Sequence, residues 1–326
     1  MDNLTHSLVG ALLGQMGLKR KTGLAMPTLI IAANIPDIDA VTVLLGGQQH
    51  LALRRGITHG PIAMVLLPLL LWGAMLWFDR WQTQRGKRPE KRLPINKSWL
   101  LGLAYIGCLS HLLFDWFNSY GVRLLEPFSS QWFYGDTLFI IDVWIWTALV
   151  AGVCLSWRWE KNNRNNWQTP ARVTFLAISA YIFGNGTITA VAEHAALVRL
   201  TAGQSVLMGS TLVVANPKPV LFWEREILWR NGGGRFGKGT YALSDGLKLD
   251  LTASARNCWH CPGFPVQNAA LQNADLRAFL FWSRMPVAKF RGKGSKRRLE
   301  ISDQRFNNPL VADRFTIRVL LPSHRQ

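Results

Sequence analysis

The sequence predicts an α-helical polytopic membrane protein with a C-terminal soluble, strand-rich α+β domain. Within the first 195 residues, apolar runs alternate with basic loops, and several runs are long enough to cross a bilayer. From about residue 200 the apolar runs become short and alternating, which is typical of strands. Hydrophobic residues make up 49% of the chain and charged residues only 17%. We therefore expect a helical membrane domain over 1–195 and a soluble domain over 200–326.

The first two apolar segments, 4–18 and 24–35, are short. A helix rises about 1.5 Å per residue and the hydrocarbon core is roughly 30 Å thick, so neither segment spans it fully. Each could be a partial span, an interfacial helix or one arm of a re-entrant pair. Pro36 disfavours helix at the preceding residue, so the chain should turn there and present Asp37 and Asp39.

Longer apolar runs follow, and they are the predicted membrane spans: 61–78, 98–117, 138–157 and 171–192. The loop 79–97 carries seven Lys or Arg residues and 158–172 carries four, whereas 118–137 carries only Arg123. The positive-inside rule places the two basic loops in the cytoplasm. We therefore expect a multi-pass membrane protein whose chain after residue 192 lies outside the cytoplasm.

The net charge of +18 raises the alternative of nucleic-acid binding. Many of the Lys and Arg residues flank apolar segments, so membrane topology explains them better. We expect membrane lipids as partners and no nucleic acid.

The C-terminal domain has its own pattern. Segments 220–230, 298–302 and 315–321 read as strands, 231–234 as a Gly-rich turn and 274–282 as a helix. Cys258 and Cys261 form a Cys-x-x-Cys pair around His260. A local disulfide is the favoured interpretation, and a redox pair or metal binding stays open.

The most informative polar pair is His111 and Asp115, four residues apart in an apolar run. Residues at this spacing share one helix face, and ionisable groups in a membrane segment are costly unless they function or pair. The predicted topology brings further polar groups to the same outer depth. The candidate metal ligands are His6, Asp37, Asp39, His59, His111 and Asp115.

Imidazole and carboxylate ligands without thiolates suit a divalent ion, with zinc first and manganese next, and argue against a closed structural zinc site. One ion or a pair of ions could be held. His6 could act as ligand or base. Arg54 and Arg55 could bind an anionic group of the substrate.

Neighbouring polar residues have predicted roles as well. Thr5 and Thr58 give His6 and His59 each a hydroxyl neighbour. Asp136 is expected to cap a helix that begins at 138, and Asp142 could support the metal site from behind.

Several motifs in order resemble the YdjM-like family: Thr5-His6, Pro36-Asp37-Ile38-Asp39, Arg55-Gly56-Ile57-Thr58-His59-Gly60, His111-Leu-Leu-Phe-Asp115 and Asn118-Ser-Tyr-Gly121. The resemblance covers roughly residues 1–160 and implies a bacterial inner-membrane, metal-dependent hydrolase with the six ligands above. With the predicted topology, it implies that the C-terminal domain is periplasmic. Many members have His where this chain has Arg54, so a further ligand is missing or Arg54 binds a substrate anion. The C-terminal domain lies outside the resemblance, as in a longer form of the family.

The leading hypothesis is a membrane-bound hydrolase that uses a metal-activated water on a lipid-borne or membrane-adjacent ester. The His-x-x-x-Asp pair is also similar to ligand pairs of zinc-dependent phospholipases C, which favours a phosphoester. Two alternatives stay open: a transporter of metal ions or protons, and a non-enzymatic membrane scaffold whose polar cluster joins helices. The sequence leaves the substrate and the oligomeric state undefined.

Overall fold

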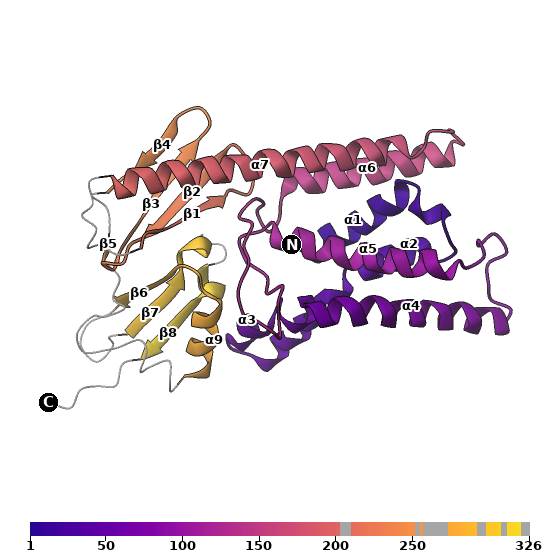
Figure 1. Cartoon of the computed structure of the whole chain (residues 1–326), viewed down its shortest axis with the longest axis horizontal. Coiled ribbons are helices and arrows are strands. Elements are labelled where there is room, and N and C mark those ends of the chain that lie inside the picture. Colours follow the sequence, from indigo (N-terminus) through magenta and orange to yellow (C-terminus); the bar gives the residue numbers. More distant parts are fainter. Residues whose placement is uncertain (203–209, 252–254, 257–272, 292–297, 308–311, 321–326) are drawn as a thin grey trace. The chain divides into compact units, whose positions relative to one another are not determined.

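The computed structural model describes residues 1–202, 210–251, 255–256, 273–291, 298–307 and 312–320 (Figure 1). The described chain forms two compact units. The first comprises Met1–Val41 and Arg55–Gly186, and the second Thr42–Arg54 and Thr187–Gln326. The predicted fold class is confirmed, because the N-terminal region is mostly helical and the C-terminal region is rich in antiparallel strands.

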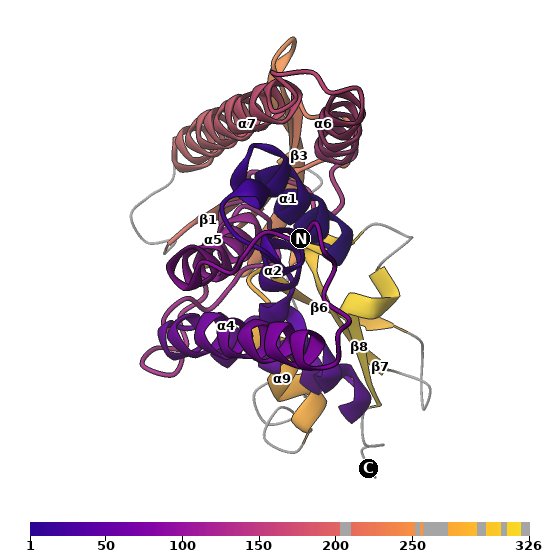
Figure 2. The same cartoon turned by 90° about the vertical axis from the view of Figure 1, so that its right-hand side faces the viewer.

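The first unit combines short helices with long ones. The short elements are α1 (Asn3–Gln15), η1 (Leu18–Arg20), α2 (Ala25–Ala32), η2 (Ile35–Leu45) and η3 (Ile57–His59). The long helices are α4 (Pro61–Gln84), α5 (Lys97–Trp116), α6 (Val143–Lys161) and α7 (Thr169–Thr201). Both η2 and α7 continue into the second unit, beyond Val41 and Gly186. These helices form one continuous packing arrangement. Helix α1 packs on α2, α5 and α6, and α2 packs on α4 and α5 (Figure 2).

Two glycines let α1 and α5 approach α2 closely. A Cβ added to Gly10 of α1 would lie 2.7 Å from the carbonyl oxygen of Leu29, and one added to Gly107 of α5 would lie 3.0 Å from the same oxygen. Gly10 stands four residues after His6, and Gly107 four residues before His111. Residues at this spacing share a helix face, so each close crossing also brings a histidine toward the end of α2.

Within the described residues, three helices are long and apolar enough to cross a membrane: α4, α5 and α7. Helices α2 and η2 are bent by 41° relative to each other. Taken together they are also long and apolar enough, as a broken span or a re-entrant loop would be. Large apolar side chains on these helices face outward, such as Leu70 at 65% and Phe183 at 79% exposure. These exposed apolar faces indicate a membrane protein whose solvent there is lipid.

The predicted span 138–157 is wrong in its bounds. Helix α6 begins only at Val143, because Asp142 is its N-cap and accepts hydrogen bonds from the backbone of Trp144 and Ile145. Helix α6 therefore extends into the polar sequence that ends at Lys161. Within the described residues it is not among the helices that are long and apolar enough to cross a membrane. Asp136, which we predicted as the cap, instead has a left-handed backbone with φ of 47° and starts no helix.

The second unit contains two antiparallel sheets. In the larger, β1 (Leu212–Pro217), β2 (Glu224–Arg230), β3 (Arg235–Ala242) and β4 (Gly246–Leu249) lie in that order, and β5 (Ala255–Arg256) pairs with β3. The smaller has the order β6 (Pro286–Arg291), β7 (Arg298–Asp303) and β8 (Thr316–Leu320). The remaining elements are α3 (Gln49–Leu53), α9 (Ala274–Trp282), η7 (Gln304–Phe306) and η8 (Ala312–Phe315).

The strands and helix predicted in this region are present, with small shifts of their ends. Ala192 and Ala196, near the end of α7, pack on Ala215 and Ile227 of the larger sheet. The segment around α3 packs on α9, with Gln48 donating a backbone hydrogen bond to Asp275. The Cys258–Cys261 pair lies outside the described residues.

Candidate metal centre

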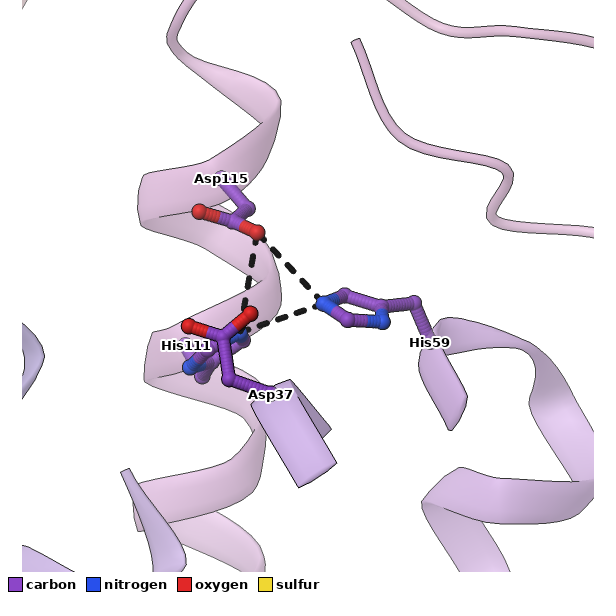
Figure 3. Close-up of side chains that lie close together, drawn as sticks. All are labelled: Asp37, His59, His111 and Asp115. Carbon is purple, nitrogen blue, oxygen red and sulfur yellow. Dashed lines mark hydrogen bonds and ion pairs between the residues drawn. The ribbon is translucent and has the colours of Figure 1, made fainter. Parts of the chain in front are cut away.

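Four buried side chains from three separate segments converge in the first unit (Figure 3). Asp37 comes from η2, His59 from η3, and His111 and Asp115 from one face of α5. One ligand atom from each lies within 4.8 Å of the others. His59, His111 and Asp115 are fully buried, and Asp37 is 4% exposed. We call these four residues the ligand cluster.

The orientation of His111 is set by the end of α2. Its Nδ1 lies 2.8 Å from the carbonyl oxygen of Ala33. A carbonyl only accepts, so Nδ1 must carry the proton and donate. In the neutral ring, Nε2 therefore carries a lone pair, and this atom faces the rest of the ligand cluster.

A hydroxyl sets the orientation of His59 in the same way. Thr58 Oγ1 donates to Oδ2 of Asp39 at 2.9 Å and lies 2.9 Å from Nδ1 of His59. The single hydroxyl proton goes to the carboxylate, so the oxygen accepts from Nδ1–H of His59. His59 thus also directs a lone pair from Nε2 into the ligand cluster. Asp39 acts on the cluster through Thr58, and its carboxylate also accepts from the backbone of Arg55 at 2.7 Å.

Two ring lone pairs and two carboxylates consequently face one another. Nε2 of His59 lies 3.2 Å from Nε2 of His111, and Oδ2 of Asp115 lies 3.4 Å and 3.6 Å from these two atoms. Oδ1 of Asp37 lies 3.9 Å from Nε2 of His111. Arg55 pairs with Asp115 at this point, and a metal ion or a shared proton among the remaining acceptors would stabilise the set further.

The spacing fits a metal ion. Zinc binds imidazole and carboxylate at about 2.0–2.2 Å, and a tetrahedron with such bonds has edges of about 3.3–3.6 Å. Three of the separations above lie within or close to this range. Hydrogen bonds on the outer ring nitrogens, as His59 and His111 have, are the usual support of metal-bound histidine. The residues present therefore fit a divalent ion, although they do not specify which one.

Arg55 makes its contacts in the protein interior. Its Nε lies 2.8 Å from Oδ2 of Asp115, and its side chain is 5% exposed. Its guanidinium also donates to Oδ1 of Asn118 at 3.1 Å and lies over the ring of Tyr120, 4.7 Å from the centroid. These contacts hold Asp115 in place and balance its charge. The predicted role of Arg55 in binding a substrate anion remains a prediction, and the geometry gives it a structural role as well.

His6 borders the ligand cluster. Its ring stacks on that of His111 with centroids 3.9 Å apart. Its Nε2 lies 3.3 Å from Oδ1 of Asp115 and has no hydrogen-bond partner among the described residues. Oδ1 of Asp115 also contacts the amino group of Met1. His6 is therefore placed beside the cluster with a ring nitrogen left for a further ligand or a water.

The other predicted residues lie outside the ligand cluster. Asp39 lies behind the cluster, and Arg54 belongs to the second unit. Asp142 caps α6 and accepts from Tyr181 at 3.0 Å. The Thr5 hydroxyl does not support the His6 ring, because it donates to Asp2 and accepts from Trp146.

Two supports were not predicted, namely the carbonyl of Ala33 and the amide of Asn118. The Asn118-Ser-Tyr-Gly121 motif was a signal for the second, but a carbonyl leaves no mark in a sequence.

An apolar groove of about 430 Å³ reaches the ligand cluster at Asp37. Its lining comes from the continuous segment that joins α2 to η2, namely Ile30, Ile31, Asn34, Ile35, Asp37 and Ile38. Four isoleucines and one residue of the ligand cluster thus line one surface depression.

Comparison with known proteins supports the sequence resemblance. A family model described as YdjM inner membrane protein matches residues 1–192. The chain is also 26% identical over 163 residues to the uncharacterized protein YfhP of Bacillus subtilis (strain 168), a match that covers 48% of this chain and 46% of the relative. The chain thus aligns with less than half of that relative's length. No solved structure matches the chain.

Proposed function

The chain belongs to the YdjM inner membrane protein family, and we propose that it is a membrane-bound, metal-dependent hydrolase. The observation that carries the proposal is the ligand cluster, in which Asp37, His59, His111 and Asp115 gather their acceptor atoms around one point. Three His or Asp residues with one open position are typical of catalytic metal sites, whereas closed structural zinc sites are rich in thiolates. No thiolate belongs to this cluster.

The ion expected in the cluster is zinc, with manganese as the alternative. When bound, the ion would supply a Lewis acid that activates water and polarises an ester oxygen. The protein's own part is to hold the ligands before the ion arrives. Ala33 and Thr58 fix the two histidine rings, and Arg55 fixes Asp115.

We assign His6 the role of a base or an additional ligand. Its Nε2 is buried beside Asp115 and has no hydrogen-bond partner among the described residues, so it can accept a proton from a water at the cluster. The substrate proposed is a lipid-borne or membrane-adjacent ester, and a phosphoester fits the ligand types best. The predicted periplasmic side for the cluster and for the C-terminal unit remains part of this proposal.

The first test is the metal content of the full chain, purified in detergent and measured by mass spectrometry. We expect about one divalent ion per chain, since the four residues of the ligand cluster gather around one point. Three of them would hold the ion while the remaining position is left to water. His111→Ala and Asp115→Ala should lose it. His194→Ala is the matched control, because this exposed histidine of α7 lies outside the ligand cluster and its loss should leave the metal content unchanged.

Hydrolysis is then tested with phosphate release from phosphatidic acid in mixed micelles and from a soluble aryl phosphate. Activity that requires the metal and is lost in His111→Ala supports the proposal. If wild-type protein holds no metal even after reloading, the hydrolase is wrong. The cluster is then a proton-handling or structural network, as the transporter and scaffold alternatives require.

A further inference from the structure

We infer that the isoleucine-lined groove beside Asp37 holds a hydrocarbon chain of the substrate, so that the substrate is lipid-borne and not merely membrane-adjacent. This inference rests on the proposed function, because it takes Asp37 as the reaction end of the groove. The proposed occupant is a single alkyl or acyl chain attached to an anionic ester.

The lining supports an alkyl chain. Ile30, Ile31, Ile35 and Ile38 offer only aliphatic surface, and a groove of about 430 Å³ is within the range of small-ligand sites. Ile31 is 40% exposed and Ile38 is 61% exposed, so two of the walls are uncovered by the protein. A methylene moved into the groove from water gains about fourfold in affinity, whereas one moved from the lipid layer gains only its packing against the isoleucines.

The polar groups of the groove lie where the head of such a ligand would end. The Asp37 carboxylate belongs to the ligand cluster, whose ion would attract an anionic ester. The Asn34 amide also lines the groove. Its Nδ2 donates to Ser7 Oγ at 3.0 Å and to the Ile30 carbonyl at 2.8 Å. Both amide protons are then used, and Oδ1 can accept from a hydroxyl of the ligand.

The location of the groove supports an occupant that comes from the lipid layer. It lies on α2 and η2, the bent pair that is apolar enough to be a broken span or a re-entrant loop. A chain in the hydrocarbon layer could enter such a groove without passing through water. A soluble phosphoester would gain nothing from its aliphatic walls.

The test uses dodecyl phosphate with a photoreactive diazirine on the third carbon from the phosphate, added to the full chain in detergent. Labelled residues are mapped by peptide mass spectrometry. We expect saturable labelling of 30–38 that is displaced by unlabelled dodecyl phosphate and not by an equal concentration of ethyl phosphate. Ile31→Trp should fill the groove and reduce this labelling about tenfold. Ile106→Trp is the matched control, because Ile106 is an exposed isoleucine of α5 that does not line the groove.

Labelling spread evenly over α4, α5 and α7, without saturation, would overturn the inference, because the probe would then report only the detergent layer. In parallel, a photoreactive amino acid is placed at position 38. Its cross-linking to a second copy of the chain would overturn the inference as well, since another copy would then cover the groove. Metal content is measured on the same samples. Saturable labelling without metal supports the groove and contradicts the hydrolase, whereas metal without such labelling contradicts the groove alone.

Discussion

The hydroxyl of Thr58 should control metal affinity although it is not a ligand. Thr58→Val removes the oxygen that lies 2.9 Å from both Nδ1 of His59 and Oδ2 of Asp39, and keeps the shape of the side chain. Oδ2 of Asp39 lies 3.6 Å from the same Nδ1, too far for a hydrogen bond to take over. The ring of His59 then loses the contact that fixes which nitrogen faces the ligand cluster.

The expected loss is a 10- to 100-fold weaker metal affinity, which is the usual effect of removing a support behind a metal-bound histidine. This corresponds to about 1.4–2.7 kcal/mol, and it agrees with the about 1–3 kcal/mol that a buried polar group costs when it loses its hydrogen bond. The assay is competition for zinc against a chromogenic chelator, using the full chain in detergent. Thr58→Ser keeps the hydroxyl and should restore most of the affinity.

Equal zinc affinity in folded wild-type and Thr58→Val protein would refute the reasoning. So would a Thr58→Ser variant as weak as Thr58→Val, because the effect would then come from packing and not from the hydroxyl.

Further predictions concern the supports of the fold. Gly107→Val should push α5 away from α2, destabilise the protein by about 1–3 kcal/mol and abolish metal binding, as seen by thermal unfolding and metal analysis. Asp142→Ala should cost about 1 kcal/mol through loss of the α6 cap while Asp142→Asn costs little, measured in the same melts. Asp303→Asn should raise the hydrogen-exchange rates of β6 and β7, because it leaves the buried Arg305 without its carboxylate. The expected loss of folding stability is about 3–5 kcal/mol. In the wild type, burial alone would raise the pKa of Asp303, but the charge and hydrogen bonds of Arg305 hold this pKa below its ordinary value. The stabilisation should be complete above about pH 3.9 and be lost as pH falls through the lower folded pKa; unchanged exchange down to pH 2 would contradict it.

Some features of this protein follow from local sequence. Helix α9 spans Ala274–Trp282 as predicted, since Asn273 provides a cap just before an apolar run. His111 and Asp115 share one face of α5 because helix geometry places residues four apart on the same side. The order of motifs likewise indicated the family before any contact was known.

The tertiary structure alone decided how those residues are used. The start of α6 depended on which of two aspartates, Asp136 or Asp142, has a backbone able to cap it. The segment 42–54 belongs to the second unit because α3 packs on α9, more than 200 residues later in the chain.

The candidate site shows the same division most clearly. Sequence could nominate imidazoles and carboxylates, but the tautomer of His111 depends on the carbonyl of Ala33, 78 residues away. Arg55, expected to bind a substrate anion, is also paired with Asp115 in a buried setting, which no local pattern indicated. Hydrogen-bond partners are chosen through space, so a one-dimensional pattern identifies the groups that can bind a metal, whereas the packed fold determines which of their atoms face it.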